Sequence, residues 1–242
     1  MIASAGEPQL FFENLDGLQE HLNNLYGARN AEYLSSPMDC VALFAVGTRD
    51  LRQALRADDD ELQRVAVARL GSRIFPFTQL SEEPLLVREG LEVKYPILGC
   101  SYCGSHPCQC GETRGDANLA WDEVGLREHW SLSRWQREMD FMYGDHNRER
   151  GISYVTGRLD DELVEVMALE HFAPRLKSDE LRSQRILELA DLTAWTLGIG
   201  NVLGIDVQEV VEERYGDGCA TCSAMPCVCA EHDFDHVYDI LN

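Results

Sequence analysis

Apolar residues recur at spacings of three and four positions along most of the chain, and alternating runs of β-branched residues are short. This periodicity gathers apolar side chains on one face of an α-helix, so it predicts an all-α fold. In the C-terminal half, the pattern predicts four helices, at about 133–144, 157–172, 179–202 and 207–215. Pro174 ends the second helix and Gly204 closes the third. Asp206 and Glu209 form a capping box at the start of the fourth. Four helices joined by short turns favour a bundle.

The first of these helices has a counterpart in the N-terminal half. The segment "LQEHLNNLYGARNAE" at 18–32 aligns without a gap on "WQREMDFMYGDHNRE" at 135–149, with identical Gln, Tyr, Gly and Asn residues. Asp16 and Ser133 precede the two segments, and both are residue types that cap helix N-termini. The match indicates a repeated helical unit.

The cysteine clusters repeat in register as well. "CSYCGSHPCQC" at 100–110 recurs as "CATCSAMPCVC" at 219–229, with all four cysteines and one proline at an interval of 119 residues. A chance similarity between two helical segments does not account for this agreement. We therefore predict two tandem four-helix units, residues 1–115 and 116–242, each capped by a cysteine cluster.

Two predicted helices of the C-terminal unit carry pairs of acids three residues apart. Glu162 and Glu165 lie in "RLDDELVEV", and Glu188 and Asp191 lie in "ILELADLTAW". Residues three apart share a helix face, so each pair presents two carboxylates together. If the helices pack against each other, the four carboxylates converge and repel one another until a hard cation such as Mg²⁺ or Mn²⁺ binds. The alternative, two solvated helix faces of an acidic chain, stays open from the residues alone.

This arrangement resembles the MazG-type all-α nucleoside triphosphate pyrophosphohydrolases, whose signature is E-E-x-x-E followed by E-x-x-D. The resemblance covers about residues 133–216 and includes the segment "GIDVQEVVEERY". Asp161, also a candidate catalytic residue, stands where the family has its first Glu.

The resemblance implies that the four acids bind Mg²⁺ and that the protein cleaves a (d)NTP to a (d)NMP and pyrophosphate. Family members usually work as dimers or larger assemblies. The tandem units are therefore expected to form a pseudodimer, and such pseudodimers could associate into a homo-oligomer.

Substrate-binding candidates lie near the acids. Trp195 is four residues after Asp191, on the same face, where it can stack on a flat ligand or pack in the core. Asn147 and Arg148 are predicted in a loop after the first helix, where they could contact a base or a phosphate. Asn147 recurs as Asn30, which equally fits a capping role. Further cationic candidates for the phosphates are Arg158, Lys177, Arg185 and Arg214.

The N-terminal unit lacks the acid pattern. At any offset from 116 to 122, positions matching Glu162 fall within Cys40–Val46 and those matching Asp191 within Arg69–Phe75, and no acid lies in either window. The positions that match Glu165 and Glu188 at these offsets carry no acid either. We expect a degenerate unit retained for packing, and the sequence leaves open whether its Lys94 or its Arg29 reaches the active half.

The clusters follow the pattern C-x2-C-x4-C-x-C, which suits one closed, structural, tetrahedral Zn²⁺ each and therefore two zinc ions per chain. The expected ligands are Cys100, Cys103, Cys108 and Cys110, and Cys219, Cys222, Cys227 and Cys229. Disulfides, a redox switch and an iron–sulfur cluster are the alternatives.

The composition limits the partners. Twenty-one basic and 42 acidic residues give a net charge of -21, which opposes binding to nucleic acid or to an anionic membrane. No signal-peptide pattern and no run of about 18 apolar residues is evident, so we expect a cytoplasmic protein. The leading hypothesis is the enzyme, and the alternative is an inactive, zinc-stabilised helical interaction module.

Overall fold

A computed structural model of the chain describes residues 11–34, 36–79, 84–95, 99–100, 102–110 and 119–229. Every regular element within these ranges is helical, which confirms the all-α prediction. The α-helices are α1 (Leu15–Tyr33), α2 (Pro37–Ala57), α3 (Asp60–Ser72), α4 (Val87–Lys94), α5 (Leu132–Arg150), α6 (Ile152–Phe172), α7 (Ser178–Leu203) and α8 (Val207–Tyr215). Short 3-10 helices are η1 (Phe75–Gln79), η2 (Trp121–Glu123) and η3 (Ala173–Arg175). The predicted unit boundary between positions 115 and 116 lies outside the described residues.

The helix predictions for the C-terminal half are confirmed, but the first helix ends later than predicted and the second begins at Ile152 instead of 157. The helix expected at 207–215 is α8, and Gly204 closes α7 in the left-handed conformation. The helix expected to end at 144 continues to Arg150, because its glycine at 144 keeps a helical backbone and the chain turns only at Gly151, where φ is 79°. Asn147 and Arg148 therefore lie in the last turns of α5, not in a loop.

The predicted caps of the two matching helices were wrong by two positions. Asn14 caps α1 and Ser131 caps α5, each accepting a hydrogen bond from a backbone N–H three residues on. Asp16 instead forms an ion pair with Arg88 at 2.9 Å. The error is the same in both halves, so the two helices start at equivalent positions.

The two halves repeat each other in element length and in one buried contact. α1 and α5 have 19 residues each, and α2 and α6 have 21 residues each. The Gln19 side chain donates to the backbone oxygen of Leu85 at 2.7 Å and accepts from the N–H of Val87 at 3.2 Å. Gln136 makes the same two bonds at the start of α8, at 2.7 and 2.8 Å. A buried glutamine of the first helix thus holds the start of the last helix in each half.

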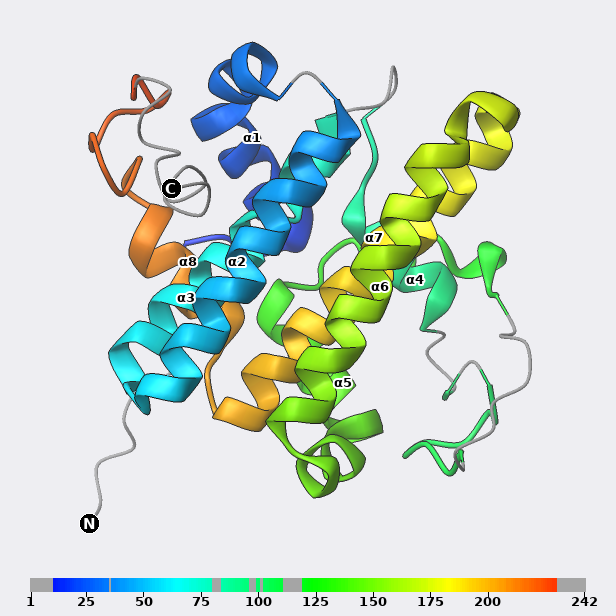
Figure 1. Cartoon of the computed structure of the whole chain (residues 1–242). Helices are drawn as coiled ribbons and strands as arrows, with labels where there is room; N and C mark the ends of the chain where they lie inside the picture. The colour runs from blue at the N-terminus through cyan, green and yellow to red at the C-terminus, as the bar shows by residue number, and fades with distance from the viewer. Residues whose placement is uncertain are drawn as a thin grey trace.

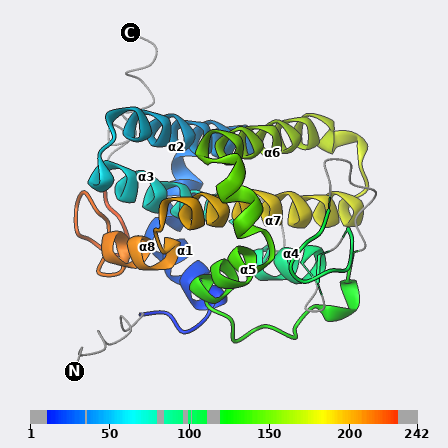
Figure 2. The same ribbon diagram turned by 90° about the horizontal axis from the view of Figure 1, so that it is seen from below.

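The last helix of each half packs against the other half. Figure 2 shows α2, α3 and α8 on one side of the molecule and α6, α7 and α4 on the other, and α4 contacts α7 as α8 contacts α3. Gly71 of α3 lies so close to α8 that an added Cβ would meet a Val211 methyl at 2.9 Å. The helices of the two halves therefore interlock around a shared interior (Figure 1).

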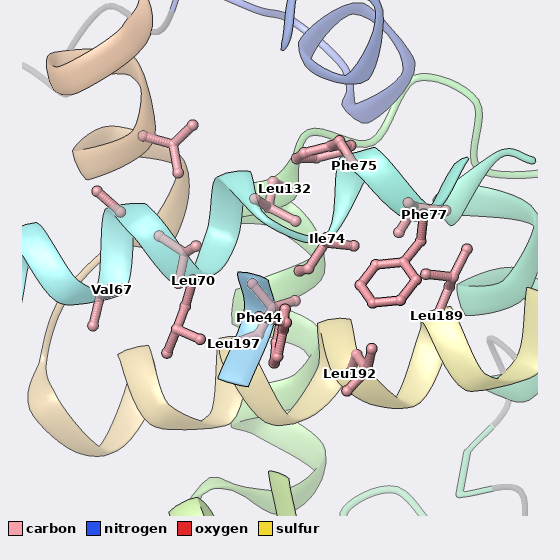
Figure 3. Close-up of a cluster of buried hydrophobic side chains, with 14 of the residues drawn as sticks. Phe44, Val67, Leu70, Ile74, Phe75, Phe77, Leu132, Leu189, Leu192 and Leu197 are labelled. Carbon is pink, nitrogen blue, oxygen red and sulfur yellow. The ribbon is translucent and has the colours of Figure 1, made fainter. Parts of the chain in front are cut away.

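The core joins side chains from both halves into one cluster. Figure 3 shows Phe44 and Ile74 of the first half among side chains of α7 that include Leu192 and Leu197, and all of them are buried. α7 has the length and apolar composition to cross a membrane, which the sequence analysis did not expect. Because most of α7 is buried and α4, α5 and α6 pack on it, the core accounts for its apolar character.

Candidate functional site

Three of the four predicted acids meet at the contact between α6 and α7. One carboxylate oxygen each from Glu162, Glu188 and Asp191 lies within 4.8 Å of the others. The two acids of α7 share one helix face, and α6 packs along α7, so the carboxylates converge instead of facing solvent. Glu165 is exposed and lies outside this triad, although it lines the same cavity. We call this cavity, of ≈ 190 Å³, the acid cavity.

The triad is short of positive charge. Burial raises the pKa of the Glu188 carboxyl to about 7, with Lys94 acting against this shift. Burial and the neighbouring Glu165 also raise the pKa of Glu162. The Oε2 atom of Glu188 is buried and has no hydrogen-bond partner. Because an unpartnered buried carboxylate oxygen is costly, this atom is available to a cation.

Glu162 anchors the aromatic side of the cavity. Its Oε1 atom accepts hydrogen bonds from Trp195 Nε1 at 3.0 Å and from Arg158 Nη2 at 3.1 Å. Trp195 is half-buried and lines the cavity, so it is neither a fully buried core residue nor a surface residue. Asp161 is exposed, pairs with Arg158 at 2.8 Å and lies outside the triad. The structure therefore separates Asp161 from the other acids.

The N-terminal half contributes two residues that the sequence analysis did not place in the site. Lys94, the last residue of α4, forms an ion pair with Asp191 Oδ2. The next residue, Tyr95, donates its hydroxyl to Asp191 Oδ1 at 3.2 Å. From the sequence, Lys94 was named with Arg29 as a residue that could reach the active half, and Tyr95 was not assigned to the site. Their role depends on the packing of α4 against α7.

The remaining wall of the acid cavity comes mainly from α5. Met139, Tyr143 and Asn147 line it, together with Gly198 of α7. A Cβ at Gly198 would lie 3.3 Å from Asn147 Nδ2, so the glycine leaves room beside this amide. A capping role was the alternative for Asn147. At the end of α5 its backbone carbonyl accepts a hydrogen bond from the N–H of Gly151 at 2.9 Å.

Three predicted arginines do not reach the acid cavity. Arg148 is exposed and pairs with two aspartates of α5. Arg185 forms a two-bond pair with Glu170, at 2.8 and 2.7 Å. Arg214 lines a different cavity, in the other half of the molecule. Ion pairs hold the guanidinium groups of Arg148 and Arg185 away from the triad, and the position of Arg214 on α8 places it at the other cavity.

The corresponding helices of the first half hold no such triad among the described residues. α2 begins and ends 115 residues before α6, at Pro37 and Ala57 against Ile152 and Phe172, so Gly47 stands at the place of Glu162. The same offset places Asp50 at the position of Glu165. The offset of 115 lies outside the predicted range of 116 to 122, so the prediction that the position matching Glu165 carries no acid does not hold at this offset.

Both cysteine clusters have dimensions that suit zinc. In each cluster the four sulfur atoms lie within 4.8 Å of one another, and the individual hydrogen-bonded pairs are 3.3 to 4.0 Å apart. A tetrahedral ion with Zn–S bonds of about 2.3 Å has sulfur atoms about 3.8 Å apart. All nine cysteines are free, and these distances are far longer than the roughly 2.05 Å of a disulfide. Each cluster can therefore bind a structural zinc ion.

The clusters dock on the opposite halves. The N–H of Cys108 donates to the carbonyl of Met142 in α5 at 3.1 Å, and that of Cys227 donates to the carbonyl of Leu25 in α1 at 2.8 Å. Tyr102, inside the first cluster, lines the acid cavity. The clusters thus link the two halves and do not only cap the helix that precedes them.

No known protein family, curated protein or solved structure matches the chain. The chemistry of the acid cavity is therefore the basis for a functional proposal.

Proposed function

We propose that the protein is a Mg²⁺-dependent nucleoside triphosphate pyrophosphohydrolase that converts a (d)NTP to a (d)NMP and pyrophosphate. The observation that carries the proposal is the convergence of carboxylate oxygens of Glu162, Glu188 and Asp191 within 4.8 Å of one another, beside the acid cavity that Glu162 and Asp191 line. The same cavity presents an indole, a carboxamide and two cations. These are the groups that bind a base and its phosphates.

The donor set suits a hard divalent cation. All its members are carboxylate oxygens, which favour Mg²⁺ or Mn²⁺ over softer metals, and the buried Oε2 of Glu188 lacks any other partner. Glu162, Glu188 and Asp191 would hold the ion, with Glu165 at the exposed side of the cavity as a fourth acid. Bound there, Mg²⁺ would neutralise phosphate charge and lower the pKa of an attacking water molecule.

The protein's own side chains supply binding and orientation. Lys94 and Arg158 are within reach of the acids and offer positive charge to the phosphates in a chain of net charge -21. The hydrogen bond from Trp195 to Glu162 fixes the indole at the cavity wall, where a base can stack on it. The Asn147 carboxamide offers one acceptor and two N–H donors to a base edge.

The first half completes this site in the manner of a partner subunit. Lys94 and Tyr95 contact Asp191 from the end of α4, whereas the described residues of the first half hold no such triad. On this proposal the chain is a tandem MazG-like pseudodimer, with a degenerate N-terminal unit, an active C-terminal unit and two structural zinc ions. A cytoplasmic location belongs to the same proposal.

Pyrophosphate release from a panel of NTPs and dNTPs tests the proposal. Purified, zinc-loaded protein is expected to turn over at least one nucleotide with Mg²⁺ and none after Mg²⁺ is withheld. Glu162→Gln and Asp191→Asn should each lower kcat/KM at least about 100-fold, since loss of even an outer partner of a metal ligand costs about 10- to 100-fold. The matched controls are Asp179→Asn and Glu180→Gln, exposed acids in the first turn of α7. Full activity in the triad variants would refute the proposal.

An inactive, zinc-stabilised interaction module is the second candidate. It is favoured by the exposed apolar side chains Val164, Met167 and Phe172 along α6. Under this alternative no nucleotide is hydrolysed, while the zinc content is unchanged and α6 variants such as Val164→Asp lose binding to a partner protein.

A further inference from the structure

A second cavity, of ≈ 170 Å³, lies where the first half and α8 meet. Helix α1 contributes to its wall as α5 does to the acid cavity, and the end of α8 borders it as the end of α4 borders the acid cavity. Tyr26 and Asn30 take the places that Tyr143 and Asn147 have in α5. The chain therefore contains two cavities with related walls.

The two cavities differ in charge. The second contains no carboxylate among the described residues that line it, and we call it the arginine cavity after Arg29, Arg69, Arg73 and Arg214. Gly47, at the position of Glu162, makes room for one of these guanidinium groups, because a Cβ there would lie 2.9 Å from Arg73 Nη1. The second cavity therefore presents guanidinium groups where the acid cavity presents carboxylates.

Two of the four guanidinium groups lack acidic partners. Arg69 pairs with Asp50 at 3.2 Å, and Arg29 Nη1 donates to the Cys227 sulfur of the second cluster at 3.9 Å. Within the described chain Arg73 and Arg214 form no ion pair, and Arg73 Nη1 and Arg214 Nε are buried without hydrogen-bond partners. Buried guanidinium N–H groups left unpaired are costly.

We propose that the arginine cavity binds a phosphate-bearing anion without a metal ion. Guanidinium groups match phosphate oxygens in geometry and charge, and an anion between Arg73 and Arg214 would satisfy their buried N–H groups. The rest of the chain, with its excess of 21 negative charges, repels such an anion, so binding concentrates here. The inference does not rest on the proposed hydrolysis, because it concerns the other cavity and requires no metal.

Calorimetric titration of the zinc-loaded 242-residue chain tests the proposal. Inorganic phosphate, pyrophosphate and ATP are titrated separately, in buffer freed of Mg²⁺ by a resin and without a chelator that would remove zinc. At least one of them is expected to bind with one site per chain. Binding of all three identifies the phosphate group as the recognised chemistry, and binding of ATP alone identifies a nucleotide. Arg73→Met and Arg214→Met should each weaken binding at least tenfold.

Matched variants separate binding from structure. Arg64→Met, on the outside of α3 where Arg64 pairs with Glu213 at 2.7 Å, and Glu188→Gln in the acid triad should bind as the wild type does. Arg73→Met should keep or raise the Tm, because it removes a buried charge without a partner. The proposal is overturned if no probe binds at 1 mM, if the Arg73 and Arg214 variants bind normally, or if Glu188→Gln abolishes binding. Loss of pyrophosphohydrolase activity in all assays would leave this result unaffected.

Discussion

Glu188 combines burial, two acidic neighbours and an oxygen without a hydrogen bond, so its ionisation is coupled to both folding and metal binding. The raised pKa means that the folded protein holds the Glu188 proton more tightly than the unfolded chain does. Its contribution to stability is therefore fully present below about pH 4.5, the ordinary value, and is lost as the pH rises through about 7.

We predict a pH-dependent effect of Mg²⁺ on thermal stability. At pH 8 Glu188 is ionised and the triad needs a cation, whereas at pH 5.5 its proton competes with the metal. Saturating Mg²⁺ should therefore raise the Tm more at pH 8 than at pH 5.5, as measured by differential scanning fluorimetry. Glu188→Gln should remove most of this difference. An equal Mg²⁺ effect at both pH values would contradict the prediction.

Lys94 provides a second prediction. Its ammonium pairs with Asp191, so it competes with a metal at the triad but can also bind substrate phosphate. Lys94→Met should lower the Kd for Mg²⁺ severalfold and raise the KM for the nucleotide, with a smaller change in kcat. Metal titration and steady-state kinetics check the two effects. Weaker Mg²⁺ binding in this variant would argue against the competition.

At the level of elements, the starts of α4 and α8 depend on one glutamine each. Gln19 and Gln136 come from the first helix of their half and satisfy one carbonyl and one N–H at the start of the last helix. All four of these bonds are buried. The glutamines therefore orient the helices that carry Lys94 and Arg214 into the two cavities.

Gln136→Ala should lower the free energy of unfolding by about 2–6 kcal/mol, because each of two buried backbone groups left unpaired costs about 1–3 kcal/mol. Gln19→Ala should have a similar effect, as its twin in the other half. The exposed Gln184→Ala on α7 is the control and should change stability by less than about 0.5 kcal/mol. Urea denaturation measures all three, and a difference below about 1 kcal/mol for Gln136→Ala would remove the assigned role.

At the scale of the whole molecule, the halves are joined by exchanged last helices and by the cysteine clusters. The backbone of each cluster bonds to the first helix of the other half, at Met142 and at Leu25. Loss of one zinc ion should therefore affect the cavity that the cluster borders more than the other cavity. Tyr102 places the first cluster at the acid cavity, and Cys219 places the second at the arginine cavity.

Elemental analysis should find two zinc ions per chain. The double variant Cys103→Ser, Cys108→Ser should retain one zinc ion and lose more Mg²⁺-dependent turnover than Cys222→Ser, Cys229→Ser does. The second variant should lose more binding to the arginine cavity. Equal losses in both assays would indicate that the clusters stabilise the fold as a whole, without a local effect on the neighbouring cavity.

Local sequence patterns determined the helices, the repeat, the spacing of the acids and the two cysteine clusters. Each of these depends on residues within a turn or a short loop of one another, which is why α8 could be predicted from 207 to 215. The boundaries of α5 and its cap were less accurate, because Gly144 keeps a helical backbone and Ser133 is held inside the helix by a long-range hydrogen bond from its N–H to Gln208.

Only the tertiary structure decided which side chains share a site. Glu165 and Glu188 look equivalent in the sequence, yet Glu165 is exposed and lies outside the triad, whereas Glu188 is half-buried and belongs to it. Lys94 and Tyr95 enter the acid cavity, and Arg214 enters the arginine cavity, because the last helix of each half packs across to the other half. Such long-range packing depends on the fit of apolar surfaces over the whole core, which no local pattern of residues encodes.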